Sequence, residues 1–134
     1  MISFLKFVKL KKIKMFTRKK YSLKSHNTFG LDVTADQFIE INSKEQLNDL
    51  NSFKNFNFEN LLILGSGSNL LFLEDYKGVV LKLSFKGIVI DEENNDFVIV
   101  KAYAGEEWDN LAHFAAKKNY GGIENLSMIP GTVG

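Results

Sequence analysis

The sequence of 134 residues has no cysteine, two histidines and one proline. Without cysteine, the protein can form neither a disulfide framework nor a metal site built on thiolates. The histidines, His26 and His113, are isolated and lack carboxylate partners at ligand spacing, so we predict no metal site and assign neither histidine a catalytic role. No apolar run approaches the roughly 18 to 20 residues that cross a bilayer, so we expect no membrane span.

Acidic residues are missing from the first 24 positions, which hold nine Lys or Arg. The rest of the chain carries 8 basic and 16 acidic side chains, a net charge of −8, although the whole chain is at +1. Such an acidic body argues against a nucleic-acid surface. Residues 1–20 mix lysines with apolar residues without a clear helical period, so we predict a basic extension that is disordered or a short helix and dispensable to the fold. Either Met1 or Met15 would then be the native start.

Residues 61–71, LLILGSGSNLL, run from four apolar residues directly into glycines, serines and an asparagine. The apolar run predicts a central strand buried on both faces. Gly65 and Gly67 would let the backbone turn sharply and point its N–H groups into one concavity, a nest for an anion such as phosphate. Further donors would come from Ser66, Ser68 and Asn69. The alternative is a plain turn between two strands.

Two common nucleotide motifs do not fit this stretch. The dinucleotide fingerprint G-x-G-x-x-G would need a glycine at position 70, where Leu70 stands. A P-loop would need a Lys-Ser or Lys-Thr pair to close the glycine loop, and none follows at the required distance. If residues 65–70 bind phosphate, they do so in another fold.

Hydrophobic patterning favours an α+β domain with mixed sheets and short helices. A first helix would begin at Ser43, with Gln46 at capping-box spacing and a buried stripe of Leu47, Leu50 and Phe53. Expected strands are 36–41, 61–64, 79–83, 85–90 and 97–104, with the last two antiparallel.

A second helix should follow Gly105, because Glu106, Glu107 and Asp109 suit its first turn and Lys117 and Lys118 its last. Gly121 or Gly122 would stop it. Its apolar stripe predicts that the single tryptophan is a core residue and not a cofactor contact. The members of this stripe are Trp108, Leu111, Ala112 and Ala115.

The last residues, 121–134, contain the only proline among several glycines. Pro130 fixes φ and lacks an N–H, and Gly131 and Gly134 allow close approach of a flat or charged ligand. We predict a second tight loop, adjacent in space to residues 65–69; a simple terminal turn is the alternative. Since the sequence stops within this apolar segment, we expect a truncated domain.

Three stretches in this order, HNTFGLD, LLILGSGSNLLFLEDYKGVVLKL and KAYAGEEWDNLAHFAAKKNYGGIENLSMIPGTVG, resemble the UDP-N-acetylenolpyruvoylglucosamine reductase family over about residues 23–134. The resemblance implies the N-terminal part of an FAD-binding domain of the vanillyl-alcohol-oxidase/p-cresol-methylhydroxylase type. Residues 21–134 would form this incomplete domain. It also implies a cytoplasmic flavoprotein of peptidoglycan synthesis and cell wall biogenesis.

The resemblance also implies roles for two loops. Gly65, Ser66, Gly67, Ser68, Asn69 and Leu70 would bind the pyrophosphate and neighbouring parts of FAD, and Ile129, Pro130, Gly131, Thr132 and Gly134 the flavin side. Backbone N–H groups would meet the phosphate charge without a basic side chain. Asn27 and Thr28 would shape an entry loop. Gly67→Val would then weaken FAD binding more than it destabilises the apoprotein.

The implied reaction passes hydride from NADPH to FAD and then to UDP-N-acetylglucosamine enolpyruvate, giving UDP-N-acetylmuramate. The family's catalytic arginine, serine and glutamate lie beyond the segment that matches Gly134, so we assign no catalytic residue and expect no turnover by this chain alone. We expect no nucleic-acid partner, and the oligomeric state stays open. The alternatives are a non-flavin nucleotide-phosphate binding module, and a nucleic-acid or membrane-surface binder acting through the basic N-terminus.

Overall fold

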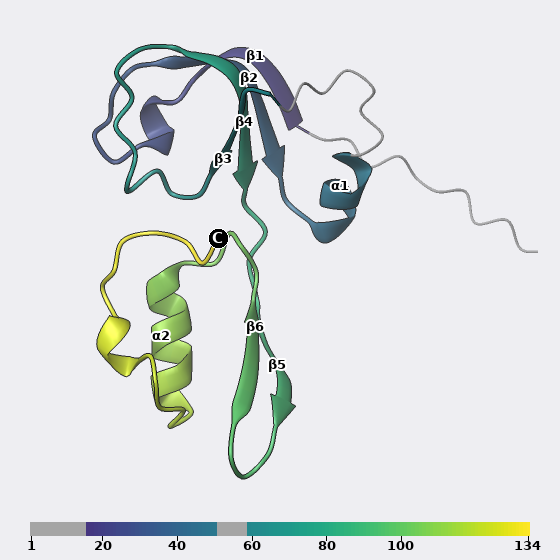
Figure 1. The fold of residues 1–134 in the computed structure, drawn as a ribbon, viewed down its shortest axis with the longest axis vertical. Helices are drawn as coiled ribbons and strands as arrows, with labels where there is room; N and C mark the ends of the chain where they lie inside the picture. The colour runs from purple at the N-terminus through teal and green to yellow at the C-terminus, as the bar shows by residue number, and fades with distance from the viewer. Residues whose placement is uncertain (1–15, 51–58) are drawn as a thin grey trace, which may run out of the picture.

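The computed structural model describes residues 16–50 and 59–134, which form two lobes joined at a narrow junction (Figure 1). One lobe is a four-stranded sheet with one short helix, and the other is a β-hairpin beside a longer helix. The strands are β1 Phe16–Ser22, β2 Thr34–Ile41, β3 Leu61–Leu64, β4 Tyr76–Leu83, β5 Ile88–Glu93 and β6 Val98–Ala102. The helices are α1 Lys44–Asp49 and α2 Trp108–Lys117, with 3₁₀ turns η1 Lys24–His26 and η3 Glu124–Leu126.

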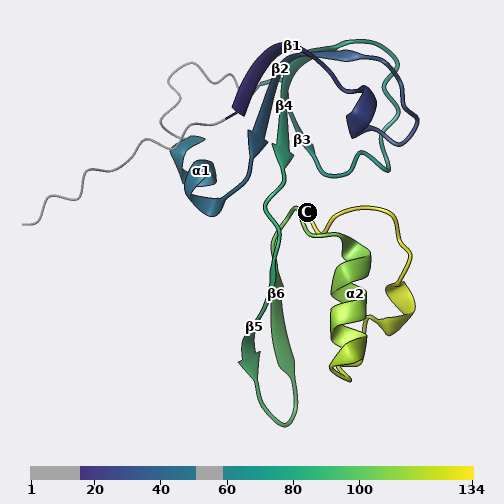
Figure 2. The same ribbon diagram turned by 180° about the vertical axis from the view of Figure 1, so that it is seen from behind.

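The four-stranded sheet has the order β1-β2-β4-β3, in which β1 is antiparallel to β2 and the other neighbours are parallel. The carboxyl ends of β2, β3 and β4 therefore lie at the same edge of the sheet, facing the second lobe (Figure 2). Mixed sheets with short helices confirm the predicted α+β class. The common edge places the loop after β3 at the junction of the two lobes.

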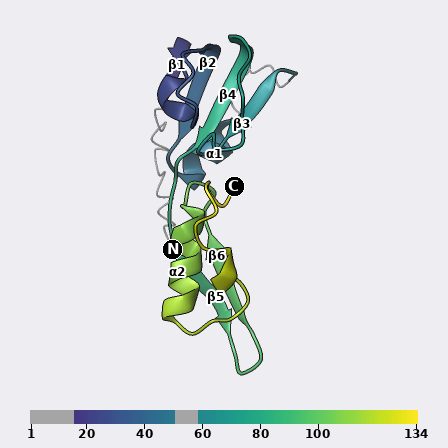
Figure 3. The ribbon, with the colours of Figure 1, turned by 90° about the vertical axis from the view of Figure 1, so that its left-hand side faces the viewer.

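Strand β3 lies at an edge of this sheet and not at its centre, which corrects the prediction (Figure 3). Leu64 is fully buried, but Ile63 is 58% exposed, so the strand is not buried on both faces. The central apolar run is Val79 to Leu81 of β4, which is buried. A short run of aliphatic residues predicts a strand but not its position in the sheet, because both β3 and β4 satisfy the same pattern.

Each face of the sheet carries its own apolar cluster, as the alternation of side chains along a strand requires. On one face, Phe38 and Val80 pack with Leu64, under the loops that follow β1 and β3. On the other face, Ile39 and Leu81 pack with residues of α1. The predicted helix start is confirmed, because Ser43 Oγ accepts a hydrogen bond from the N–H of Gln46 at 3.3 Å. Phe53 of the predicted stripe is outside the described residues.

Strand β1 differs from the predicted basic extension. Residues 16–20 are neither disordered nor helical but pair with β2, and Lys20 forms an ion pair with Asp36 at 2.6 Å. These residues are all exposed, so backbone pairing holds the strand and no apolar alternation marks it in the sequence. Residues 1–15, including both candidate start positions, are outside the described residues.

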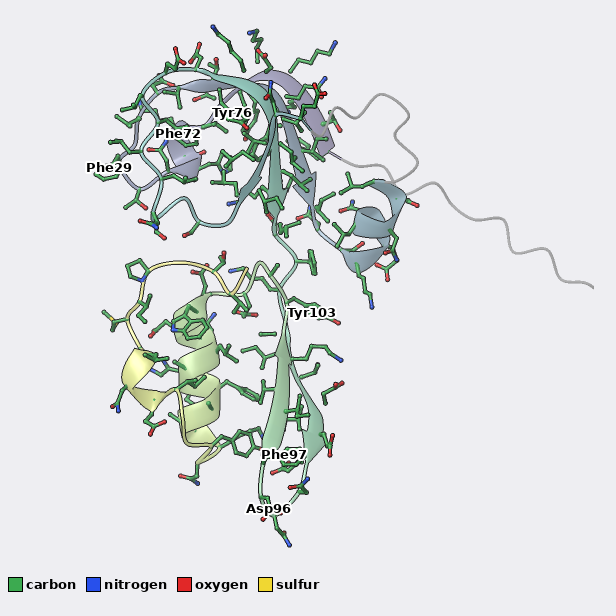
Figure 4. The ribbon with its side chains drawn as sticks, in the orientation of Figure 1. Phe29, Phe72, Tyr76, Asp96, Phe97 and Tyr103 are labelled. Carbon is green, nitrogen blue, oxygen red and sulfur yellow. The ribbon has the colours of Figure 1, made fainter. Side chains whose placement is uncertain are left out.

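In the second lobe, β5 and β6 pair antiparallel as predicted, and α2 lies beside the hairpin (Figure 1). Asp96 and Phe97 lie at the tip of this hairpin, and Tyr103 lies at its base near the junction (Figure 4). Helix α2 ends at Lys117, before the predicted stop at Gly121 or Gly122, and Asn119 takes a positive φ of 57°. Asparagine tolerates this left-handed conformation better than most residues, so the helix ends earlier than predicted.

The stripe of α2 faces inward: Ala112 and Ala115 are buried, and Trp108 and Leu111 are half-buried. The Trp108 indole donates a hydrogen bond to the carbonyl of Leu126 at 2.7 Å, which ties η3 to the helix. Among residues 16–50 and 59–134, no helix is both long and apolar enough to cross a bilayer. In the same ranges, no three His, Cys, Asp or Glu side chains gather as metal ligands would.

Candidate functional site

The glycine loop, residues 65–70, leaves β3 at the junction of the lobes. Gly67 has a φ of +72°, a conformation that residues with a side chain rarely adopt. Its carbonyl accepts a hydrogen bond from the N–H of Thr28 at 3.3 Å, and its α-carbon lies against the backbone of His26. Glycine is therefore required at position 67 because the entry loop packs directly onto the backbone there.

This contact corrects the reason given for Gly67→Val. A Cβ at position 67 would overlap the carbonyl oxygen of His26 and come within 3.0 Å of the α-carbon of Asn27. The added side chain would thus meet the entry loop of the sheet lobe and not the space where a ligand would sit. We therefore expect substitution at Gly67 to disturb the fold before it disturbs binding.

The C-terminal loop, residues 128–134, lies against the glycine loop, as predicted. Ser68 Oγ donates a hydrogen bond to the carbonyl of Pro130 at 3.1 Å, across 62 residues of sequence. A Cβ at Gly65 would overlap Thr132 Oγ1 and lie 2.9 Å from the carbonyl oxygen of Gly134. The absence of a side chain at Gly65 is therefore what lets the two loops touch.

Between them the loops enclose an open groove of about 320 Å³, which we call the junction groove. All of its lining residues belong to the two predicted loops or to the end of β3, and none is Lys, Arg, Asp or Glu. Its lining is Ile63, Leu64, Gly65, Ser66, Gly67, Ser68, Asn69, Leu70, Pro130, Gly131, Thr132 and Gly134. Ile129, which the resemblance assigned to the flavin side, is not part of this lining and is 48% exposed.

Ser66 has a buried hydroxyl oxygen without a hydrogen-bond partner in the described structure. A buried polar atom left unpaired costs roughly 1 to 3 kcal/mol, so native proteins seldom keep one without a reason. The hydroxyl lies 3.9 Å from the position of a Cβ at Gly131, in the floor of the junction groove. A hydroxyl and backbone N–H groups suit a phosphate or a polar cofactor edge, so the residues present fit the predicted FAD.

The C-terminal loop is fixed to the second lobe by main-chain hydrogen bonds. The N–H of Trp108 donates to the carbonyl of Gly131 at 3.0 Å, and the N–H of Val133 donates to that of Glu106 at 2.9 Å. The N–H of Gly134 donates to the carbonyl of Ala104 at 3.0 Å. These bonds form a short antiparallel pairing that carries one wall of the junction groove on the start of α2.

Asp109 in the first turn of α2 binds the residues that lead into this loop. Its Oδ1 accepts hydrogen bonds from the hydroxyl of Ser127 and from the N–H of Met128, the latter at 2.7 Å. Met128 has a φ of 64°, a strained value for a residue with a side chain. The bond from Ser127 is the first cause that lowers the pKa of Asp109, followed by the bond from Met128. His113, one turn along, is exposed and contacts Asp109.

Glu106 is a buried carboxylate that ties the hairpin to α2. It accepts hydrogen bonds from the N–H of Gly87 at 2.9 Å, from the Asn110 amide at 2.9 Å and from the N–H of Glu107 at 3.2 Å. The bond from Asn110 is the largest cause that lowers the pKa of Glu106. The sequence predicted Glu106 in the first turn of the helix, but α2 begins at Trp108 after the N-cap Glu107, so Glu106 lies just before it and holds the hairpin instead.

Asn27 shapes the entry loop, as expected. Its amide donates to the carbonyls of Leu23 and Leu31 at 2.8 and 3.0 Å, and its Oδ1 accepts from the N–H of Leu31 at 2.9 Å. His26 next to it stacks on Phe38 at 4.9 Å between ring centres, and burial lowers its pKa. His26 is thus a packing residue under the glycine loop.

Lys82 is a site residue that the sequence reasoning missed. It lies opposite Leu64 in the pairing of β3 with β4, and its Nζ donates to the carbonyl of Gly65 at 2.9 Å. The signal was present, because Lys82 is the cation in the otherwise apolar run VVLKL, at the carboxyl end of a buried strand. Such a position usually holds an aliphatic residue, so a lysine there needs a partner.

Comparisons with known proteins agree with this geometry. A family model described as an FAD binding domain matches residues 35–134. UDP-N-acetylenolpyruvoylglucosamine reductase of Flavobacterium johnsoniae is 41% identical over 114 residues, 85% of this chain and 33% of the relative. The same-named protein of Bacteroides fragilis is 42% identical over 115 residues, 86% of this chain and 34% of the relative. The chain thus spans about a third of the length of these curated relatives.

A solved structure shows the same fold. The crystal structure of UDP-N-acetylenolpyruvylglucosamine reductase (MurB) from Thermus caldophilus matches with a TM-score of 0.59 and 25% identity, over 90% of this chain and 40% of that one. The relatives carry the name of the family that the three sequence stretches resemble, which confirms the resemblance. With 100 of its 134 residues inside the matched domain, the chain belongs to the FAD-binding domain family.

Proposed function

We propose that this chain binds FAD in the junction groove and forms the flavin-holding part of an NADPH-dependent reductase that acts in the cytoplasm on UDP-N-acetylglucosamine enolpyruvate. The observation that carries the proposal is the unpaired Ser66 hydroxyl in a groove lined by residues of both loops that the family resemblance assigned to FAD and by the end of β3. The relatives named as this reductase support the substrate and its reduction, and the family resemblance supplies NADPH as the donor.

The glycine loop supplies the polar wall. Backbone N–H groups of residues 65–70, with the hydroxyls of Ser66 and Ser68 and the amide of Asn69, would bind the diphosphate. The C-terminal loop supplies the other wall, where Pro130, Gly131, Thr132 and Gly134 would approach the flavin side. FAD, when bound, would supply the hydride chemistry, and these residues would hold and orient it.

A titration of the purified chain with FAD, followed by flavin fluorescence, tests the proposal. We expect saturable binding with one FAD per chain, and weaker binding by Ser66→Ala because the hydroxyl that the ligand would satisfy is gone. Ser25→Ala, at an exposed position of η1, is the matched control and should bind as the unaltered protein does.

Two results would contradict the proposal in different ways. Absence of FAD binding would remove the flavin role altogether. Binding of ADP as tight as that of FAD, with riboflavin unbound, would favour a non-flavin nucleotide-phosphate module instead, since the flavin ring would then contribute nothing.

A further inference from the structure

We propose that Lys82 is a positioning residue of the junction groove, which fixes the peptide between Gly65 and Ser66 and supplies, from behind the glycine loop, the positive charge that a bound diphosphate needs. The inference rests on the proposed function, because it concerns the same groove and its ligand. It differs from the expectation that backbone N–H groups meet the phosphate charge without a basic side chain.

The first step is geometric. The Lys82 Nζ donates to the carbonyl of Gly65 at 2.9 Å, and the chain has no cis peptide bonds in its described part. In a trans peptide the N–H of the following residue points away from the carbonyl. The hydrogen bond from Lys82 therefore fixes the direction of the Ser66 N–H, one of the donors of the loop. Without it, the peptide between Gly65 and Ser66 could rotate, since glycine restricts φ and ψ little.

The second step concerns charge. None of the residues that line the junction groove is charged, yet a diphosphate brings at least two negative charges. Lys82 is half-buried, and its hydrogen-bond acceptor at Gly65 is a neutral carbonyl. A neutral hydrogen-bond acceptor does not cancel the positive charge of the ammonium. The attraction of that charge for an anion is stronger where water is excluded. The groove thus lies in front of a fixed cation held by the sheet.

The surroundings of Lys82 explain how this cation is tolerated. Burial lowers its pKa, while the nearby carboxylates of Glu40 and Glu107 act in the opposite direction and Lys86 adds to the lowering. Glu40 is itself held by a hydrogen bond from Ser84 Oγ at 2.7 Å. A partly buried lysine costs stability, so a lysine kept at such a position indicates a function. A cation placed for an anionic ligand is such a function.

The test compares Lys82→Met, Lys82→Arg and Lys86→Met in titrations with FAD, ADP and riboflavin. We expect Lys82→Met to weaken FAD and ADP binding by about tenfold or more, because the diphosphate loses a nearby positive charge and the Ser66 N–H is no longer fixed, and to leave riboflavin binding unchanged. Lys82→Arg should retain most of the affinity. Lys86→Met removes a neighbouring lysine that is paired with Glu107 at 3.1 Å, and it should bind as the unaltered protein does.

Salt dependence provides a second readout that a purely structural role would not change. The affinity of the unaltered protein for ADP should fall with rising salt, and that of Lys82→Met should fall less. If Lys82→Met does not fold, Lys82→Gln keeps a donor for Gly65 without the charge and should lose ADP affinity and its salt dependence.

Equal ADP affinity of the unaltered and methionine proteins would overturn the inference while leaving FAD binding intact. An equal loss for ADP and riboflavin would also overturn it, because it would indicate general damage to the groove. Failure of the unaltered protein to bind FAD at all would contradict the proposed function, and the inference with it.

Discussion

The carbonyl oxygen of His26 occupies the position that a side chain would take at Gly67. The entry loop and the glycine loop are therefore in backbone-to-backbone contact, reinforced by the hydrogen bond from the Thr28 N–H to Gly67. The strand that leads to His26 and the strand that leads to Gly67 are β1 and β3, the two outer strands of the sheet. The contact bridges them across one face of the sheet and sets the shape of the glycine loop before any ligand arrives.

Replacement of Gly67 should therefore destabilise the ligand-free protein. Gly67→Ala combines a positive φ with overlap against His26, so we expect a loss in free energy of unfolding of about 3 kcal/mol or more. Gly30→Ala has a similar φ of +64° but open space around it, and should lose only about 1 kcal/mol. Urea denaturation of both variants measures the difference. Equal losses would show that backbone strain alone, and not the His26 contact, requires glycine at position 67.

Asn27→Ala should also weaken the fold. The variant removes three hydrogen bonds; the half-buried Leu31 carbonyl loses its Asn27 donor, and the Leu23 carbonyl keeps the donor at the His26 N–H, so we expect a loss of about 2 to 3 kcal/mol. Asn95→Ala, at an exposed position of the β5–β6 hairpin, is the control and should stay within about 0.5 kcal/mol of the unaltered protein. A loss as small as that of the control would indicate that water replaces the Asn27 amide.

Asp109→Ala should loosen the C-terminal loop without unfolding α2. The variant removes the acceptor for the Ser127 hydroxyl and the Met128 N–H, so the strained backbone at Met128 loses its support. Hydrogen exchange should be several-fold faster at the Met128 amide, and unchanged at amides in the centre of α2. FAD affinity should fall in parallel, because the wall of the junction groove is less fixed. Unchanged exchange at Met128 would mean that the main-chain hydrogen bonds of the loop to Trp108, Glu106 and Ala104 hold it without Asp109.

Stability should fall in acid through Glu106. Its pKa is lowered from the ordinary value of 4.5 in the folded protein, so the unfolded chain takes up the proton at higher pH than the folded one. The stabilisation is complete above about pH 4.5 and is lost as the pH falls through the folded pKa. Melting temperatures measured from pH 7 to pH 3 report this loss.

Glu106→Gln isolates this contribution from that of the other carboxylates. At pH 7 the variant should lose about 1 to 3 kcal/mol, because its amide N–H₂ must replace either the oxygen that accepts from Gly87 or the oxygen that accepts from Glu107 and Asn110. The difference from the unaltered protein should shrink as the pH falls below 4.5. A constant difference across this range would show that Glu106 acts through packing and not through its charge.

The sequence predicted the two loops and most elements because their signals are local. Gly65 needs to lack a side chain for the loops to touch, and Ser43 caps α1, so both follow from residue type. The order of strands could not be predicted, because β3 and β4 are both short aliphatic runs and their neighbours are set by long-range pairing. Strand β1 was missed because pairing with β2 holds it while its side chains are exposed. Lys82 was missed because its partner, the carbonyl of Gly65, belongs to the loop after a different strand, 17 residues away in sequence.

The two edge strands of the four-stranded sheet, β1 and β3, differ in how readily a strand of another chain can pair with them. Along β1, the side chains of Arg18, Lys19 and Lys20 discourage another strand from pairing there. Along β3, which in the described ranges pairs with β4 on one side, the sequence LLIL offers unprotected backbone and no charge. This edge can template the addition of a strand. We therefore expect the chain in concentrated solution to self-associate through β3, beside the junction groove, and not to add a strand at β1.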